Sequence, residues 1–279
     1  MGEHRMAYTG RTFIREREFY CGDRLDIDLY TVWQGKGKRR KKCKPTREVQ
    51  QKLNERKSQE HMIRLVLENF TDKDLALHLT YREGCEPATE EEVERDVHNY
   101  YRRVRRYRKK LGLPDLKYMW RWDRGEERGR VHIHMFILGG VDRDTLEELW
   151  GKGFANSKRL QFENGSVEGL AVYMGKNKKS YRRWNGSRNL KQPEPRVQDG
   201  KLTVEQMETV ADAVEKKTAS ILFEEMFPGY ELDVAEVRIN SVNRQMYISV
   251  SMRKKQKGRK APARKSAGAI AAFLNGEEW

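Results

Sequence analysis

The run from Val131 to Leu138, VHIHMFIL, constrains the fold of this chain more than any other stretch. Apart from two histidines, its residues are β-branched, aromatic or aliphatic, and Gly139-Gly140 ends it. Such a run is typical of a buried β-strand. Side chains alternate between the two faces of a strand, so His132 and His134 share one face and Ile133 lies on the other.

The two histidines allow two interpretations. Two imidazoles on one face of a strand can hold a divalent metal ion. They can equally be hydrogen-bonded residues at a strand edge, because the pattern of histidine, one residue, histidine is short and common. The choice between a metal site and a structural role therefore depends on the residues that neighbouring segments bring close to this strand.

A second strand is predicted just before the histidine strand. Residues 116–123, LKYMWRWD, have a strand pattern, and the turn-forming segment RGEERGR connects the two. A hairpin is the simplest connection, and it brings Asp123 near His132 and His134 across the ladder. A carboxylate beside two imidazole nitrogens suits Mg²⁺ or Mn²⁺ with open positions for a substrate.

Other segments complete an α+β pattern. Residues 74–81 alternate as a strand, and a helix starts at Thr89, where Glu92 completes a capping box, and stops at Gly112. Further helices are expected at 46–68, 142–150, 168–180 and about 203–226, and hairpins at 12–33 and 235–252. We expect an antiparallel sheet with flanking helices and a metal site on its paired central strands.

The charge of the chain points to a polyanion as partner. Lys and Arg number 57 against 42 Asp and Glu, a net charge of +15, which favours nucleic acid ahead of an anionic membrane. A solvated basic surface without a partner is the alternative. The chain lacks the apolar run of about 18 residues that a membrane span needs, and its first residues lack the apolar core of a signal peptide. Three widely spaced cysteines, without a C-x-x-C pair, indicate a reduced cytoplasm.

The predicted helix 168–180 carries a candidate nucleophile. Tyr173 and Lys176 are three residues apart and share one face of this helix. A tyrosine attacks poorly at its ordinary pKa, but a metal that polarises a phosphate and a lysine that offsets the developing charge would activate it. Taken singly, Tyr173 fits a surface aromatic and Lys176 a solvated cation.

Three stretches, in this order, resemble one known family. LALHLTY, GRVHIHMFI and YMGK are similar to the first, the metal-binding and the catalytic motifs of the HUH endonucleases, specifically the rolling-circle replication initiators of bacterial plasmids and phages. LEELWGKG and RRWNGSRNLKQP are lesser similarities. The resemblance covers roughly residues 60–195 and implies a nuclease core related to the RRM-like fold.

The chain departs from the family pattern at two positions. Many relatives have glutamate where Asp123 falls, so Glu126 competes with Asp123 as the third metal ligand. Some relatives carry a second tyrosine four residues after the first, where this chain has Asn177. The resemblance therefore implies a single-tyrosine enzyme, although Tyr181, roughly two helical turns later, could still approach the site.

The resemblance also implies a reaction. The enzyme would nick one strand of origin DNA, join Tyr173 to the 5′ phosphate, free a 3′ hydroxyl, and later transfer or religate the strand. His132, His134 and Asp123 would hold Mg²⁺ or Mn²⁺, and Lys176 would position the phosphate or stabilise the phenolate. The expected partners are single-stranded or origin DNA and a host helicase, in a bacterial cytoplasm without membrane contact.

Basic and aromatic side chains would hold the DNA. The cations expected to grip phosphates are Arg102, Arg105, Arg106, Arg128, Arg130, Arg182, Arg183 and Arg188. The aromatic side chains that would stack on unpaired bases are Trp120, Trp122, Tyr181 or Trp184, although Trp120 and Trp122 fit a core position at least as well.

Three parts are expected along the chain. Residues 1–195 would form the nuclease domain, with a β-rich start and a basic loop at 34–45, where seven of twelve residues are Lys or Arg. Residues 196–253 would add a helix and a hairpin. The basic tail 254–279 is predicted to be disordered.

Other functions compete with an initiator. A relaxase or a single-tyrosine transposase would use the same site. HUH relaxases usually show a third histidine near the pair, which we do not expect in this chain, and transposases of this type are usually about half its length. A non-catalytic nucleic-acid-binding protein would not need Tyr173, and a metal-dependent hydrolase would use water as its nucleophile.

Overall fold

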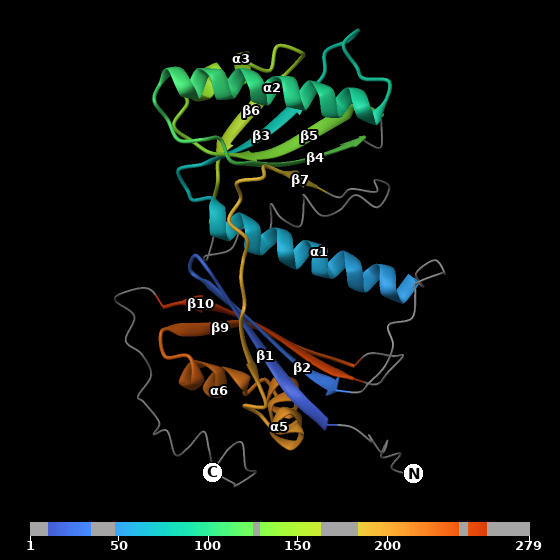
Figure 1. The fold of residues 1–279 in the computed structure, drawn as a ribbon, viewed down its shortest axis with the longest axis vertical. Coiled ribbons are helices and arrows are strands. Elements are labelled where there is room, and N and C mark those ends of the chain that lie inside the picture. Colours follow the sequence, from blue (N-terminus) through green and yellow to red (C-terminus); the bar gives the residue numbers. More distant parts are fainter. Residues whose placement is uncertain (1–10, 35–47, 125–128, 163–183, 240–244, 256–279) are drawn as a thin grey trace. The chain divides into compact units, whose positions relative to one another are not determined.

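The computed structural model describes residues 11–34, 48–124, 129–162, 184–239 and 245–255. Within these ranges the chain is α+β, with two five-stranded antiparallel sheets and several helices (Figure 1). The chain divides into two compact units, one from residues 1–50 and 193–279 and the other from residues 51–192. None of the described helices is long and apolar enough to cross a membrane.

Three predicted segments lie wholly or largely outside the described residues. They are the basic loop 34–45, the helix 168–180 and the tail 254–279. The predictions for their structure remain predictions.

The first unit is built on a sheet with the order β8-β1-β2-β10-β9. Its strands are β1 (Arg11–Cys21), β2 (Arg24–Gln34), β8 (Arg196–Asp199), β9 (Tyr230–Ile239) and β10 (Met246–Lys254). β1 and β2 form the expected hairpin, and Gly22 takes a left-handed φ of 58° in its turn. The sheet shares a core with the helices α5 (Val204–Glu215) and α6 (Ala219–Met226), and this core includes Ile14, Ile27, Met207, Phe223 and Ile248.

The N-terminal hairpin pairs with strands from the C-terminal part of the chain. β2 pairs with β10 from Arg24↔Arg253 to Tyr30↔Tyr247, and β1 pairs with β8. The predicted domain 1–195 groups this hairpin with the histidine strand, whereas its partners in the sheet lie beyond residue 195. Alternation along a segment predicts a strand and its buried face, but it does not indicate which distant strand completes the ladder.

The expectation of a single helix at about 203–226 is wrong, because the segment forms two helices, α5 and α6. Thr203 caps α5 in a reciprocal capping box with Gln206. Lys217 then takes a φ of 60°, and the N–H of Thr218 donates to the carbonyl of Ala213. A left-handed residue after the last turn ends a helix in this way, usually as glycine, and no Gly or Pro at this point signals the break.

The second unit is built on a sheet with the order β6-β3-β5-β4-β7. Its strands are β3 (Leu75–Thr80), β4 (Tyr118–Arg124), β5 (Val131–Ile137), β6 (Ala155–Arg159) and β7 (Asn185–Gly186). Its helices are α1 (Glu48–Asn69), α2 (Glu90–Lys110) and α3 (Arg143–Glu148). α2 and α3 lie over one face of the sheet (Figure 1), and the core between them includes Leu77, Leu79, Val97, Tyr100, Ile133, Leu146 and Trp150.

α2 begins where its sequence predicted. Thr89 is the N-cap and accepts a hydrogen bond from the N–H of Glu92. The Glu92 carboxylate reaches one residue further than a standard capping box and accepts from the N–H of Ala88. Glutamates in the first turn and cations in the last turn both complement the helix dipole.

Candidate active site

The histidine strand β5 lies at the centre of its sheet, between β3 and β4. β4 and β5 form the expected hairpin, in which Asp123 lies opposite His132, and β3 brings His78 opposite His134. Side chains of directly opposed residues project from the same face of a sheet. The four residues therefore share the face that is turned away from α2 and α3, and we refer to them as the histidine cluster.

The side chains of the histidine cluster form a continuous set of contacts across three strands. His78 Nε2 lies 3.0 Å from His132 Nδ1. The ring of His78 also stacks on that of His134, with 4.8 Å between the ring centroids. His134 Nε2 lies 3.6 Å from a carboxylate oxygen of Asp123, whose other close partner is Arg121. One carboxylate and three imidazoles thus meet over the middle of the sheet.

His78 is a member of the cluster that sequence analysis missed. In LALHLTY it takes the polar phase of an alternating strand, which is also what a solvent-facing histidine would do. Only the antiparallel pairing of β3 with β5 brings it against the histidine pair. The expectation that no third histidine lies near the pair is therefore wrong. The number of histidines no longer distinguishes this chain from a relaxase.

The surroundings of the cluster lower the pKa values of two of its members, Asp123 and His78. Burial opposes ionisation of the Asp123 carboxyl, but hydrogen bonds with His134 and Arg121 outweigh it and lower the pKa of Asp123 to about 2. Burial, together with the nearby imidazoles of His134 and His132, lowers the pKa of His78 to about 4. At neutral pH Asp123 is thus a carboxylate and His78 a neutral imidazole, the forms in which both side chains bind metals.

The donor set of the cluster fits a divalent metal ion. Among the residues that the structure describes, no group of three or more His, Cys, Asp or Glu side chains is already arranged around an ion position. His78 Nε2 and His132 Nδ1 lie 3.0 Å apart, at hydrogen-bond distance from each other, so this contact would have to open before both nitrogens could bind an ion. Nitrogen donors with one carboxylate suit Mn²⁺ and related ions.

One family model matches the part of the chain that holds the cluster. Residues 74–178 match the family of replication-associated protein ORF2/G2P. No curated protein and no solved structure shows significant similarity to the chain. The ORF2/G2P match starts at β3, includes His78, Asp123, His132 and His134, and extends past Tyr173 and Lys176. The segment with the candidate chemistry is therefore the segment that resembles a replication protein.

Several predicted site residues lie outside the described residues. They are the nucleophile Tyr173 with Lys176, the competing ligand Glu126, the aromatic Tyr181, and the basic residues Arg128, Arg182 and Arg183. Of the two candidates for the carboxylate ligand, the structure describes Asp123 alone, and Asp123 lies beside His134. The roles of all these residues remain predictions.

The tryptophans of β4 lie on the core side of the sheet. Trp120 is only 2% exposed and packs in the core beneath α2, so the expectation that it stacks on DNA bases is wrong. Trp122 is half-buried and packs against the same core. Trp184 is half-buried, and its ring centroid lies 6.0 Å from that of His61 on α1.

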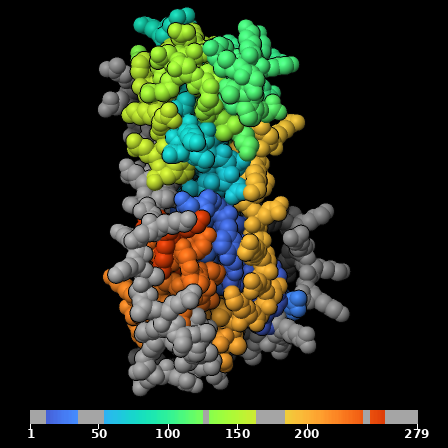
Figure 2. Space-filling model, turned by 90° about the vertical axis from the view of Figure 1, so that its left-hand side faces the viewer, coloured from blue at the N-terminus to red at the C-terminus, as the bar shows by residue number. Residues whose placement is uncertain are grey.

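The basic half of α2 is exposed, on the far side of the sheet from the histidine cluster. Arg102, Arg105 and Arg106 are all exposed, and α2 lies at the surface of the second unit, green in Figure 2. Arg188 is exposed as well, and its charge, like that of Arg105, opposes the rise in the pKa of Tyr118 that burial causes. Arg130 lies elsewhere, at the start of β5, 3.7 Å from Glu86.

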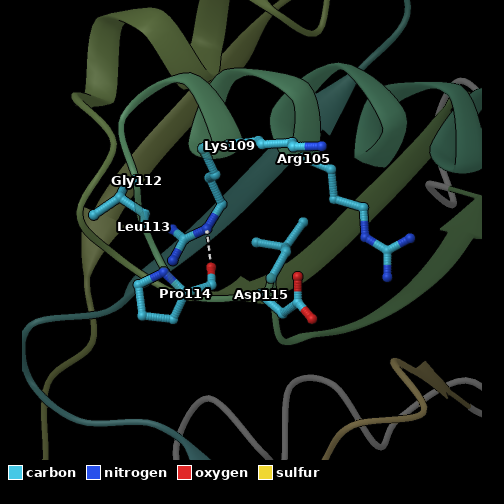
Figure 3. Close-up of a pocket in the computed structure, with 8 residues that line it drawn as sticks. Arg105, Lys109, Gly112, Leu113, Pro114 and Asp115 are labelled. Carbon is cyan, nitrogen blue, oxygen red and sulfur yellow. Dashed lines mark hydrogen bonds between the residues drawn. The ribbon is translucent and has the colours of Figure 1, made fainter.

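A cavity of about 580 Å³ lies under the end of α2 (Figure 3). Arg105, Lys109 and the segment 112–116 line it, and the buried Arg108 donates to the carbonyls of Pro114 and Gly139 beside it. Gly139 follows the last residues of β5, whereas His132 lies near the start of that strand. At about 3.4 Å per residue the two positions are roughly 24 Å apart, so the cavity is separate from the histidine cluster.

Proposed function

We propose that the chain is a rolling-circle replication initiator, of phage type, that nicks single-stranded origin DNA through a 5′-phosphotyrosine intermediate. The observation that carries the proposal is the histidine cluster. Three imidazoles and one ionised carboxylate share one sheet face, within the segment that matches ORF2/G2P replication-associated proteins. A site of this kind is suited to a phosphate, because these residues would hold a metal ion that would supply polarisation of the phosphate for attack.

The residues of the chain divide the work as follows. His78, His132, His134 and Asp123 would hold the Mg²⁺ or Mn²⁺ ion. Arg121, buried next to Asp123, keeps that carboxylate ionised and oriented. Tyr173 would lose its phenolic proton to solvent, attack the phosphorus, and form the bond from its oxygen to the 5′ phosphate. The 3′ oxygen would be displaced and would take up a proton from solvent to leave as a hydroxyl. Lys176 would stabilise the phenolate before attack and the phosphate charge afterwards.

The exposed cations would supply most of the affinity for DNA. Phosphate contacts by Lys and Arg dominate the binding of nucleic acids, and the net charge of +15 is of the sign needed. Arg102, Arg105 and Arg106 lie across the sheet from the histidine cluster, so they would contact DNA that flanks the nick and not the reacting phosphate.

The proposal is tested by trapping the intermediate. The full chain is incubated with Mn²⁺ and a pool of randomised single-stranded oligonucleotides and then run on a denaturing gel. We expect a covalent protein–DNA species that EDTA prevents, and sequencing of the trapped DNA would reveal the preferred site. Metal-dependent cleavage without an adduct would contradict the proposal and favour water as the nucleophile.

A relaxase is the second candidate, and His78 favours it. HUH relaxases usually have a third histidine near the pair, and His78 lies 3.0 Å from His132. Both enzymes would form the same adduct, so the distinction needs a cellular assay. An initiator would support replication of a plasmid that carries the trapped site, whereas a relaxase would support its transfer between cells.

A further inference from the structure

Phe154 is a large apolar side chain that the fold leaves in solvent. It lies immediately before β6 and is 64% exposed. Its neighbour Ala155 is buried in the core with Leu79, so alternation directs Phe154 and Asn156 to the opposite face. Asn156 lies opposite His78, which identifies that face as the one that carries the histidine cluster.

The backbone around Phe154 is held firmly against β3. The N–H of Thr80 donates to the Phe154 carbonyl at 2.8 Å and that of Arg82 to the Lys152 carbonyl at 2.9 Å. Trp150 Nε1 donates to the Thr80 carbonyl at 2.8 Å. The two backbone bonds extend the β3–β6 ladder to the residues just before β6, and the indole bond holds the same segment, so Phe154 is not exposed by a loose loop.

Gly153 shows how closely this segment approaches β3. A Cβ atom at position 153 would lie closer than 3.0 Å to the carbonyl oxygen of Thr80, a distance at which the backbone would have to move. Thr80 in turn lies opposite His132. Since neighbouring strands are about 4.8 Å apart, Phe154 lies two strands, or about 10 Å, from His132.

An exposed apolar residue on a protein surface is in itself ordinary. This one differs in two respects, because its backbone is fixed by hydrogen bonds and it shares a face with the proposed nicking site. Proteins that bind single-stranded nucleic acid present aromatic rings on which unpaired bases stack. The tryptophans of β4 are turned to the other face, so they do not meet this need.

We propose that Phe154 stacks on an unpaired base that flanks the scissile phosphate and thereby holds single-stranded DNA across the histidine cluster. The proposal rests on the proposed function, because it takes single-stranded DNA as the ligand of this face. It adds a base-stacking residue to the site, on the β6 side of β3.

The first test measures affinity without cleavage. A fluorescent oligo-deoxythymidine is titrated with the full chain in EDTA, and anisotropy reports binding. Phe154→Ala should weaken binding about 5- to 150-fold, the loss expected for one stacked base, whereas Phe154→Tyr should bind as the wild type does. Leu111→Ala is the matched control, since Leu111 is also exposed (51%) but lies near the cavity at the other end of the sheet.

The second test asks whether the reduced affinity comes from a base. An abasic oligonucleotide of the same length keeps the phosphates and removes the stacking partners. The wild type should prefer the deoxythymidine strand over the abasic one, and Phe154→Ala should reduce this preference by the same factor by which it weakens binding. An unchanged preference, or an affinity equal to that of Leu111→Ala, would overturn the proposal.

The two proposals fail in different ways. Loss of the covalent adduct with the stacking signature intact would overturn the nicking mechanism alone. Normal adduct formation, together with an affinity of Phe154→Ala for single-stranded DNA equal to that of the wild type, would overturn the stacking role alone. A wild-type chain that binds neither strand would overturn both.

Discussion

At the scale of single residues, the histidine cluster is a partly predictable site. His132 and His134 follow from strand alternation, and Asp123 follows from the simplest hairpin, so all three were predictable from local sequence. His78 was not, because a polar residue in an amphipathic strand has the same pattern whether it faces solvent or a partner strand. Its position depends on the pairing of β3 with β5, which local sequence does not specify.

The proposed role of His78 as a metal ligand can be tested by comparison with a second histidine, His98. His78→Ala should weaken Mn²⁺ binding in calorimetry by more than about tenfold and abolish nicking, because removal of one ligand disturbs the whole coordination shell. DNA affinity should remain, since the cations supply it. His98→Ala is the control, as His98 is exposed on α2 and hydrogen-bonded to the Glu94 carbonyl. Equal Mn²⁺ affinity in the two variants would exclude His78 as a ligand.

Variants of Asp123 and Glu126 would show which of the two supplies the proposed carboxylate ligand. Asp123→Asn keeps the shape of the side chain but removes the charge that pairs with Arg121, so Mn²⁺ binding and nicking should fall together. Glu126→Gln should leave both close to the wild type. The opposite pattern, measured in the same calorimetry and gel assays, would make Glu126 the carboxylate ligand.

At the scale of elements, the start of α2 was predictable because its signals are local. Thr89 and Glu92 mark its first turn, and such caps act within a few residues. The break between α5 and α6 was not, because Lys217 adopts a left-handed conformation without being glycine or asparagine. Tertiary packing of Ala219, Leu222 and Phe223 into the core of the first unit favours the change of direction there.

The basic half of α2 predicts a division between binding and chemistry. Arg102→Glu with Arg106→Glu should lower DNA affinity. The slope of log affinity against log salt should become shallower by about 0.7 for each phosphate of the single strand that the variant no longer binds. Nicking of a short oligonucleotide at saturating concentration should be unchanged, because α2 lies on the far side of the sheet. Arg95→Glu is the control, since Arg95 already pairs with Glu92. A fall in the saturated nicking rate would mean that α2 touches the reacting strand.

At the scale of the whole molecule, the sequence predicted an α+β chain, but it did not predict that the first unit has a separate sheet of its own. Each strand of the first unit has a readable alternation, yet β2 and β10 are separated by almost the entire chain. Pairing across such a separation leaves no local trace in either segment. The match to the ORF2/G2P family covers residues 74–178, so it does not include this unit either.

Truncations test the organisation of the first unit. Deletion of residues 256–279 leaves every described strand intact, so the thermal unfolding midpoint should stay close to that of the full chain, while the removal of five Lys and Arg should weaken DNA binding. Deletion from residue 246 removes β10, which lies between β2 and β9, and should unfold this unit, as measured by circular dichroism. A cooperative, unchanged melt without β10 would contradict the sheet order.

Peptide mapping of the trapped adduct would identify the residue of this chain that attacks DNA. After nuclease digestion of the DNA, mass spectrometry should find the phosphonucleotide on Tyr173. Tyr173→Phe removes only the attacking oxygen, so folding and DNA binding should persist while cleavage and adduct vanish together. A phosphonucleotide on Tyr181 or any other residue, or full cleavage by Tyr173→Phe, would contradict the account.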